Sequence, residues 1–127
     1  MFLYKVFLYK FIMSKPSCFC SISTFNCAFE LFGLLLSLSL YHPNEVIYIL
    51  CESKKKTYIE ESTPNPLLKI KYFVELDKYD SMDRKIMEQK GLWSEFQMSK
   101  AKVIQHALND YKDTLFMDSD IIITNVM

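Results

Sequence analysis

The chain has very little glycine and proline, with 2 and 4 of these residues among 127. Collagen-like repeats, which need glycine at every third position, are excluded. An excess of charge of one sign is also missing, because 15 basic residues balance 15 acidic ones. We therefore expect neither nucleic acid nor an anionic membrane surface as a partner. Half of the residues are hydrophobic, and this composition predicts one folded domain rather than a disordered chain.

The cysteines lack the spacing of a metal site. Cys18, Cys20, Cys27 and Cys51 contain no C-x-x-C pair, and neither histidine lies at zinc-ligand spacing from them. Cys18 and Cys20 alternate with Phe19 in an apolar run, which is typical of small hydrophobic residues in a strand. We therefore predict free thiols in a reducing compartment and a cytoplasmic location.

Long apolar runs are missing as well. Residues 31–41 are apolar, but they fall short of the roughly 20 residues that cross a bilayer, and Glu30 blocks a longer span. Residues 1–13 are apolar but contain two lysines and no small-residue cleavage site. We interpret them as an N-terminal extension, with a signal peptide as the alternative, and assign the folded unit to residues 14–127. No membrane span is predicted.

Strand-like and helix-like patterns alternate along the rest of the chain. The apolar runs predict strands at residues 17–23, 45–51, 68–76 and 114–117, and helices at residues 27–40, at 54–61 and from Ser94 onward. Residues 45–51 are almost continuously apolar, as expected for a strand covered on both faces of a parallel sheet. Lysines alternate with apolar residues in 68–76, which indicates a strand near an edge. Residues 77–91 have no clear period and are predicted to form a loop with one helical turn.

The last predicted helix carries a start signal. Ser94 and Gln97 have the spacing of a capping box, and Trp93 and Met98 have that of a hydrophobic staple. The helical period predicts an apolar face and an opposite polar face. The apolar face comprises Phe96, Val103, Ile104, Ala107 and Tyr111, and the polar face Lys102, Gln105 and Asn109.

This alternation predicts an α/β fold with a Rossmann-like, mainly parallel sheet and flanking helices. In such sheets, ligands bind outside the carboxyl ends of the strands. Polar residues follow each predicted strand: Ser23 and Thr24, then Glu52, then Glu75 and Asp77, and finally Asp118, Ser119 and Asp120. These residues are the candidates for a binding site.

The last group, in LFMDSDIII, has the pattern of a metal site. Two carboxylates separated by one residue at a strand end can bind one Mg²⁺ or Mn²⁺, with substrate phosphates completing the coordination. The metal would then neutralise a diphosphate leaving group. Burying two unpaired acids in an apolar strand costs on the order of several kcal/mol. The pattern therefore favours a metal-binding or catalytic role for Asp118 and Asp120 over a structural turn.

A lysine on the last helix points to the same site. On the helical wheel Lys100 lies between Phe96 and Ile104, at the centre of the face that should pack on the sheet. From there it can reach the strand ends and meet a phosphate or the aspartates. The alternative is that its side chain extends to water.

From about Ser17 to Asn125 the chain resembles the N-terminal half of a GT-A glycosyltransferase. This nucleotide-diphospho-sugar transferase fold includes glycogenin and bacterial galactosyltransferases. The resemblance rests on SCFCSISTFNCAFELFGLLLSLSLYHPN, on EVIYILCES and above all on WSEFQMSKAKVIQHALNDYKDTLFMDSDIII. It implies transfer of a sugar from a nucleotide-diphospho-sugar donor to an acceptor that the sequence does not identify.

The resemblance also implies roles for particular residues. Asp118 and Asp120 would hold Mn²⁺ or Mg²⁺ on the donor diphosphate. The other implied donor-binding residues are Ser23, Thr24 and Glu52 near the nucleoside, Lys100 facing the donor, and Ser119.

The chain departs from the family pattern in two ways. Glu52 stands where a shorter aspartate is expected, and only seven residues follow Asp120. The acceptor-binding half, a catalytic base and later metal ligands are therefore missing, so no catalytic residue is assigned. We expect this chain to supply the donor half of a site, and its uncovered sheet edges to favour self-association.

Two other functions are compatible with the sequence. LFMDSDIII also fits a haloacid-dehalogenase phosphatase, with Asp118 as nucleophile and Asp120 as general acid and base. That family usually has Thr or Val where this chain has Ile122, and it needs later residues that are absent here. The other alternative is an inactive, truncated product.

Overall fold

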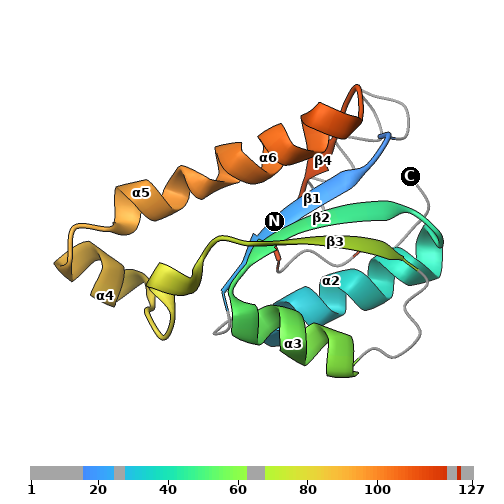
Figure 1. Cartoon of the computed structure of the whole chain (residues 1–127). Helices are drawn as coiled ribbons and strands as arrows, with labels where there is room; N and C mark the ends of the chain where they lie inside the picture. The colour runs from blue at the N-terminus through green and yellow to red at the C-terminus, as the bar shows by residue number, and fades with distance from the viewer. Residues whose placement is uncertain (1–15, 25–27, 63–67, 120–122, 124–127) are drawn as a thin grey trace.

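The computed structural model describes residues 16–24, 28–62, 68–119 and 123. Strands and helices alternate along the chain in the predicted order (Figure 1). The elements are β1 (Phe19–Ser23), α2 (Ala28–Tyr41), β2 (Val46–Cys51), α3 (Ser53–Ser62), β3 (Lys69–Val74), the 3₁₀ helix η2 (Asp77–Tyr79), α4 (Arg84–Gln89), α5 (Trp93–Gln97), α6 (Ser99–Asp110) and β4 (Leu115–Phe116). The predicted N-terminal extension, residues 1–13, lies outside the described residues.

The four strands form one parallel sheet in the order β3-β2-β1-β4. This confirms the predicted α/β class and is consistent with a Rossmann-like fold. The chain adds β2 and β3 on one side of β1 and then crosses over to place β4 on the other side. The connection after β1, through α2, and the connection before β4, through α6, lie on opposite faces of the sheet, so the boundary between these two strands is its topological switch point.

Helices cover both faces of the sheet. Figure 1 shows α2 and α3 on one face and α6 on the other. Because side chains alternate along a strand, each strand supplies both cores. The α2 and α3 side contains Phe19, Ile47, Ile49, Leu31, Leu34, Leu38 and Ile59, and the α6 side contains Cys20, Tyr48, Leu50, Val103 and Ala107.

The burial of β2 and β3 confirms their predicted positions. From Ile47 onward every residue of β2 is buried, as expected for a strand inside a parallel sheet. β3 is an edge strand, and Lys69 and Lys71 on it are exposed. Lysines on an edge strand hinder the addition of a further chain.

The prediction for residues 77–91 is wrong in part, because this segment holds η2 and also the helix α4. The carboxylate of Asp83 caps α4 by accepting the N–H of Ile86 at 2.8 Å. At the other end, Leu92 N–H donates to Met87 O and Gly91 N–H donates to Glu88 O. These two bonds form a Schellman motif, and Gly91 has the left-handed φ of 71° that the motif requires.

The predicted capping box is also wrong. α5 begins at Trp93, so Ser94 lies inside the helix and is not its N-cap. The preceding residue, Leu92, has helical rather than extended backbone angles because it closes the Schellman motif of α4. The predicted single helix is divided at Met98 into α5 and α6.

The faces of the last helix are as predicted. Val103 and Ala107 are buried, and Phe96, Ile104 and Tyr111 pack against the same core. Lys102, Gln105 and Asn109 are exposed. Among the helices that the structure describes, none has the length and apolar character to cross a membrane.

Candidate functional site

A cleft of about 420 Å³ lies at the carboxyl ends of β1 and β4. It therefore occupies the topological switch point, where ligands bind in open α/β sheets. Its floor is formed by residues at the ends of the two strands and just after them, with Glu30 of α2 beside them: Ile22, Ser23, Thr24, Asp118 and Ser119. Its wall comes from α4, α5 and the turn before them: Met82, Asp83, Arg84, Met87, Trp93 and Phe96.

The floor brings together four of the residues predicted to bind a donor or metal. Ser23 ends β1 and Thr24 follows it, whereas Asp118 and Ser119 come shortly after β4, although the two pairs lie far apart in the sequence. The parallel pairing of Phe19 with Leu115 and of Cys20 with Phe116 brings these strand ends to the same edge of the sheet. The cleft thus has hydroxyl groups and a carboxylate on one floor.

Lys100 lies beside this floor. Its Nζ is 3.7 Å from Asp118 Oδ1 and 5.4 Å from the centroid of the Phe116 ring. The side chain therefore extends over β4 toward the strand end, as the sequence predicted. It remains 52% exposed, and an ion pair this exposed contributes little to stability. Lys100 is consequently accessible to a ligand in the cleft.

Glu52 does not line the cleft. α3 begins at the next residue, and the carbonyl of Glu52 accepts the N–H groups of Lys55 and Lys56. Its side chain is only 1% exposed. A carboxylate at this position interacts favourably with the N-terminal end of a helix. Glu52 therefore lies at the start of α3, directly after the β2 residue that pairs with Ser23, but it is not among the residues that line the cleft.

The metal site predicted from the sequence can be located only in part, because Asp120 lies outside the described residues. In the remainder of the site and in the rest of the described chain, no three His, Cys, Asp or Glu side chains form a metal cluster. Asp118 lies on the floor of the cleft, with its carboxylate 3.7 Å from the ammonium group of Lys100. Mg²⁺ commonly binds one or two carboxylates and takes its other ligands from phosphate and water.

The wall of the cleft contains none of the residues predicted from the sequence to bind a ligand. The guanidinium carbon of Arg84 lies 4.8 Å from the centroid of the Trp93 ring, and Trp93 stacks on Phe96 at 5.7 Å. Phe96 in turn meets Tyr79 edge-on at 5.1 Å. The wall is thus a continuous aromatic surface with one arginine on it. The sequence feature that could have predicted α4 is the pair of capping residues at its two ends, Asp83 and Gly91.

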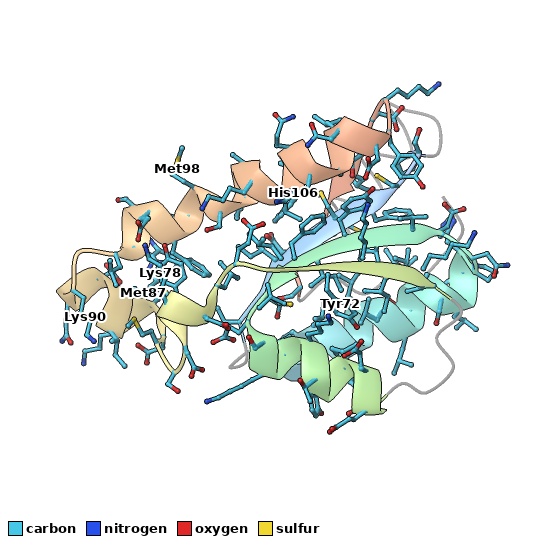
Figure 2. All side chains as sticks on the ribbon, viewed as in Figure 1. Tyr72, Lys78, Met87, Lys90, Met98 and His106 are labelled. Atoms are coloured by element: carbon cyan, nitrogen blue, oxygen red, sulfur yellow. The ribbon has the colours of Figure 1, made fainter. Side chains whose placement is uncertain are left out.

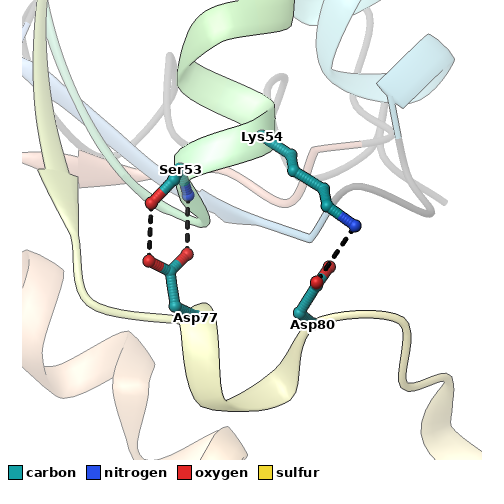
Figure 3. Close-up of polar contacts among 4 residues, drawn as sticks. All are labelled: Ser53, Lys54, Asp77 and Asp80. Atoms are coloured by element: carbon teal, nitrogen blue, oxygen red, sulfur yellow. Dashed lines mark hydrogen bonds and ion pairs between the residues drawn. The ribbon is translucent and has the colours of Figure 1, made fainter.

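Polar contacts attach this wall to the rest of the protein. The backbone N–H and the hydroxyl of Ser53 donate to the two carboxylate oxygens of Asp77 at 2.7 and 2.5 Å (Figure 3). These bonds hold the pKa of Asp77 below its ordinary value. Figure 3 also shows Lys54 next to Asp80, at 3.0 Å. Both contacts connect η2 with the first turn of α3.

A second pair of contacts connects η2 with α5. Lys78 Nζ and the hydroxyl of Tyr79 both donate to the carboxylate of Glu95, at 2.7 and 2.8 Å. These bonds lower the pKa of Glu95. Burial, together with the bond to Glu95, raises the pKa of Tyr79 to about 12. The phenol therefore stays protonated and remains a donor.

Another polar cluster lies between β3 and α6, outside the cleft. His106 stacks on Phe73 at 3.8 Å, and its Nε2 is 2.9 Å from Glu75 Oε2. On the same face Tyr48 donates to Asp110, which also accepts from Lys71 at 3.1 Å. Figure 2 shows His106 on α6, directed toward the sheet. Glu75 therefore serves to attach α6 rather than to form the cleft.

Comparisons with known proteins add no relative. No family model matches the chain, and neither a curated protein nor a solved structure is detectably similar to it. The observations that bear on function are therefore the cleft, its position in the sheet and the chemistry of its lining.

Proposed function

We propose that the cleft binds a nucleotide-diphospho-sugar through a divalent metal on Asp118 and Asp120, as the donor site of a glycosyltransferase. The observation that carries this proposal is the position of the cleft at the switch point between β1 and β4. Its volume of about 420 Å³ is in the usual range for small-molecule sites, about 300–1,000 Å³. The family resemblance of the D-x-D segment supports the same function.

The lining supplies a group for each part of such a donor. The hydroxyls of Ser23, Thr24 and Ser119 suit a ribose or sugar. A metal on Asp118 would bind the diphosphate and neutralise the charge that develops on it as the sugar leaves. Lys100, next to Asp118, suits a phosphate oxygen. Glu52 is left out of this proposal because it is buried and is not among the residues that line the cleft.

The described thiols support the cytoplasmic assignment within this proposal. Cys18, Cys20 and Cys51 are free and buried. Burial raises the pKa of Cys20 to about 11 and that of Cys51 to about 12. These side chains therefore behave as small apolar residues. We place the protein in a reducing compartment, the cytoplasm.

The cleft contains its own reporter for a binding experiment, because Trp93 is the single tryptophan of the chain and lies in the wall. Intrinsic fluorescence would be titrated with UDP, GDP and ADP, each in Mn²⁺ and in EDTA. We expect at least one nucleoside diphosphate to bind, and to bind more tightly in Mn²⁺. Asp118→Asn should remove the gain from Mn²⁺.

Glu60→Gln is the matched control, since it makes an acid-to-amide change at an exposed position of α3 outside the cleft. This variant should bind as the unaltered protein does. Far-ultraviolet circular dichroism would verify that each variant is folded. The proposal is wrong if the folded protein binds no nucleoside diphosphate, or if binding in Mn²⁺ is the same for Asp118→Asn and Glu60→Gln.

A further inference from the structure

Arg84 is the only arginine in the chain, whose other basic residues, apart from two histidines, are lysines. It lies in the wall of the cleft, at the first position of α4. Two contacts orient its guanidinium group: the face of Trp93 at 4.8 Å, and Glu88 Oε1 at 3.2 Å from Nε. The side chain nonetheless remains 67% exposed. It is thus oriented and still accessible.

The contacts of Arg84 leave most of its hydrogen-bonding capacity for a ligand. A guanidinium group carries five N–H donors in a fixed plane, and the contact with Glu88 uses the one on Nε. The other four are on the two terminal nitrogens, whose geometry matches two oxygens of a phosphate. Stacking on an aromatic ring fixes this plane before any ligand arrives.

The described lining of the cleft has more acidic than basic side chains, so a phosphate needs a positively charged contact there. Among the described residues that line the cleft there are three carboxylates, Glu30, Asp83 and Asp118, and one cation, Arg84. Carboxylates repel a phosphate. A metal on Asp118 would offset that repulsion at the floor but not at the wall. Arg84 is the lining residue that can attract a phosphate to the wall.

We propose that Arg84 is a phosphate-binding residue of the cleft, and that it binds two phosphate oxygens of the ligand with parallel N–H groups. The proposal rests on the proposed function for the identity of that ligand, the diphosphate of a nucleotide-sugar. It goes further in assigning a second phosphate contact that needs no metal. Lysine, with a single ammonium group, cannot provide the two parallel donors.

Isothermal calorimetry would measure the binding of inorganic pyrophosphate and of UDP, each in EDTA and in Mn²⁺. Calorimetry is preferred to fluorescence because substitutions at Arg84 alter the surroundings of Trp93. Arg84→Lys tests the geometry and Arg84→Ala tests the charge. Lys85→Ala is the matched control, because it removes a positive charge from an exposed neighbour on α4 that does not line the cleft.

In EDTA we expect Arg84→Lys to weaken pyrophosphate binding by about tenfold or more. Arg84→Ala should weaken it further, and Lys85→Ala should leave it unchanged. Thermal unfolding should be similar for all variants, because the side chain of Arg84 is largely exposed. The proposal is overturned if Arg84→Lys binds like the unaltered protein, or if Arg84→Ala and Lys85→Ala have equal effects.

The two probes separate this inference from the proposed function. If pyrophosphate binds through Arg84 but no nucleoside diphosphate binds, the cleft is a phosphate site and the nucleotide assignment fails. If UDP binds in Mn²⁺ and all substitutions at Arg84 are neutral, the nucleotide assignment stands and the role of Arg84 is refuted. If the folded protein binds neither probe, both proposals fail.

Discussion

Met87 connects the wall of the cleft with the core of the protein, and its replacement by alanine should loosen the wall. Met87 is 2% exposed and belongs to the same apolar cluster as Leu50, Leu76 and Val103. It also lines the cleft and accepts the closing hydrogen bond of the α4 Schellman motif from Leu92. No other residue of α4 is buried. Figure 2 shows its place in α4.

The size of the effect follows from the volume removed. Truncating a fully buried methionine to alanine costs about 2–5 kcal/mol, from lost transfer energy and from the cavity that remains. The free energy of unfolding of a domain is about 5–15 kcal/mol in total, so we expect about 3 kcal/mol to be a large fraction of it. Because α4 and α5 have few other buried side chains, they should unfold before the sheet does.

Urea denaturation, followed by Trp93 fluorescence and by far-ultraviolet circular dichroism, would test this expectation. In Met87→Ala the fluorescence transition should move to lower urea than the circular dichroism transition, because Trp93 reports on the wall. Met98→Ala is the matched control, since Met98 is 67% exposed and its loss should change stability by about 0.5 kcal/mol or less. Equal effects of the two substitutions would refute the view that Met87 anchors the wall.

Two further substitutions test how the wall is held. Gly91→Ala should lower the free energy of unfolding, measured by urea denaturation, by about 1–2 kcal/mol. The cause is the left-handed φ of 71° alone, because an added Cβ meets no atom within 4 Å. A variant as stable as the unaltered protein would contradict this expectation. The hydrogen bonds from Ser53 lower the pKa of Asp77 in the folded protein. The ionised carboxylate therefore stabilises the fold at pH values above the unfolded-state pKa, about 3.9. This stabilisation is lost as the pH falls through the lower pKa of the folded state. Asp77→Asn should therefore flatten the dependence of the unfolding midpoint on pH below about pH 4, and an unchanged acid limb would show that the Ser53 contact contributes nothing.

The sheet was predictable because its strands are distinct in composition. β2 is a continuous apolar run, which indicates an internal strand. β3 alternates lysines with apolar residues, which indicates a strand at an edge of the sheet. The regular alternation with helices then required parallel strands. The order of the strands did not follow from the pattern, because β4 could have joined either side of the sheet. Only the pairing of Phe19 with Leu115 places it beside β1.

The floor of the cleft was predictable from one rule, since the carboxyl ends of parallel strands meet at one edge. The rule brought Ser23 and Asp118 together in the lining of the cleft, whereas Glu52 lies at the same edge of the sheet without lining it. Whether a residue after a strand faces the cleft depends on how the chain turns there. After β2 the chain enters α3 at once, so Glu52 becomes part of the helix start and is buried. Sequence periodicity contains no information about that turn.

The wall escaped prediction because its helices are too short to show a period. α4 has 6 residues and α5 has 5, which is less than two turns each. What distinguishes this segment is its rare residues: the single arginine and the single tryptophan of the chain both lie in it and contact each other. All the other Lys and Arg positions of the chain are lysines. The single arginine therefore indicates a place where a planar, forked cation is needed. Residue types that a chain otherwise avoids are therefore a guide to function where periodicity ends, and the comparison of Arg84→Lys with Lys85→Ala tests that argument directly.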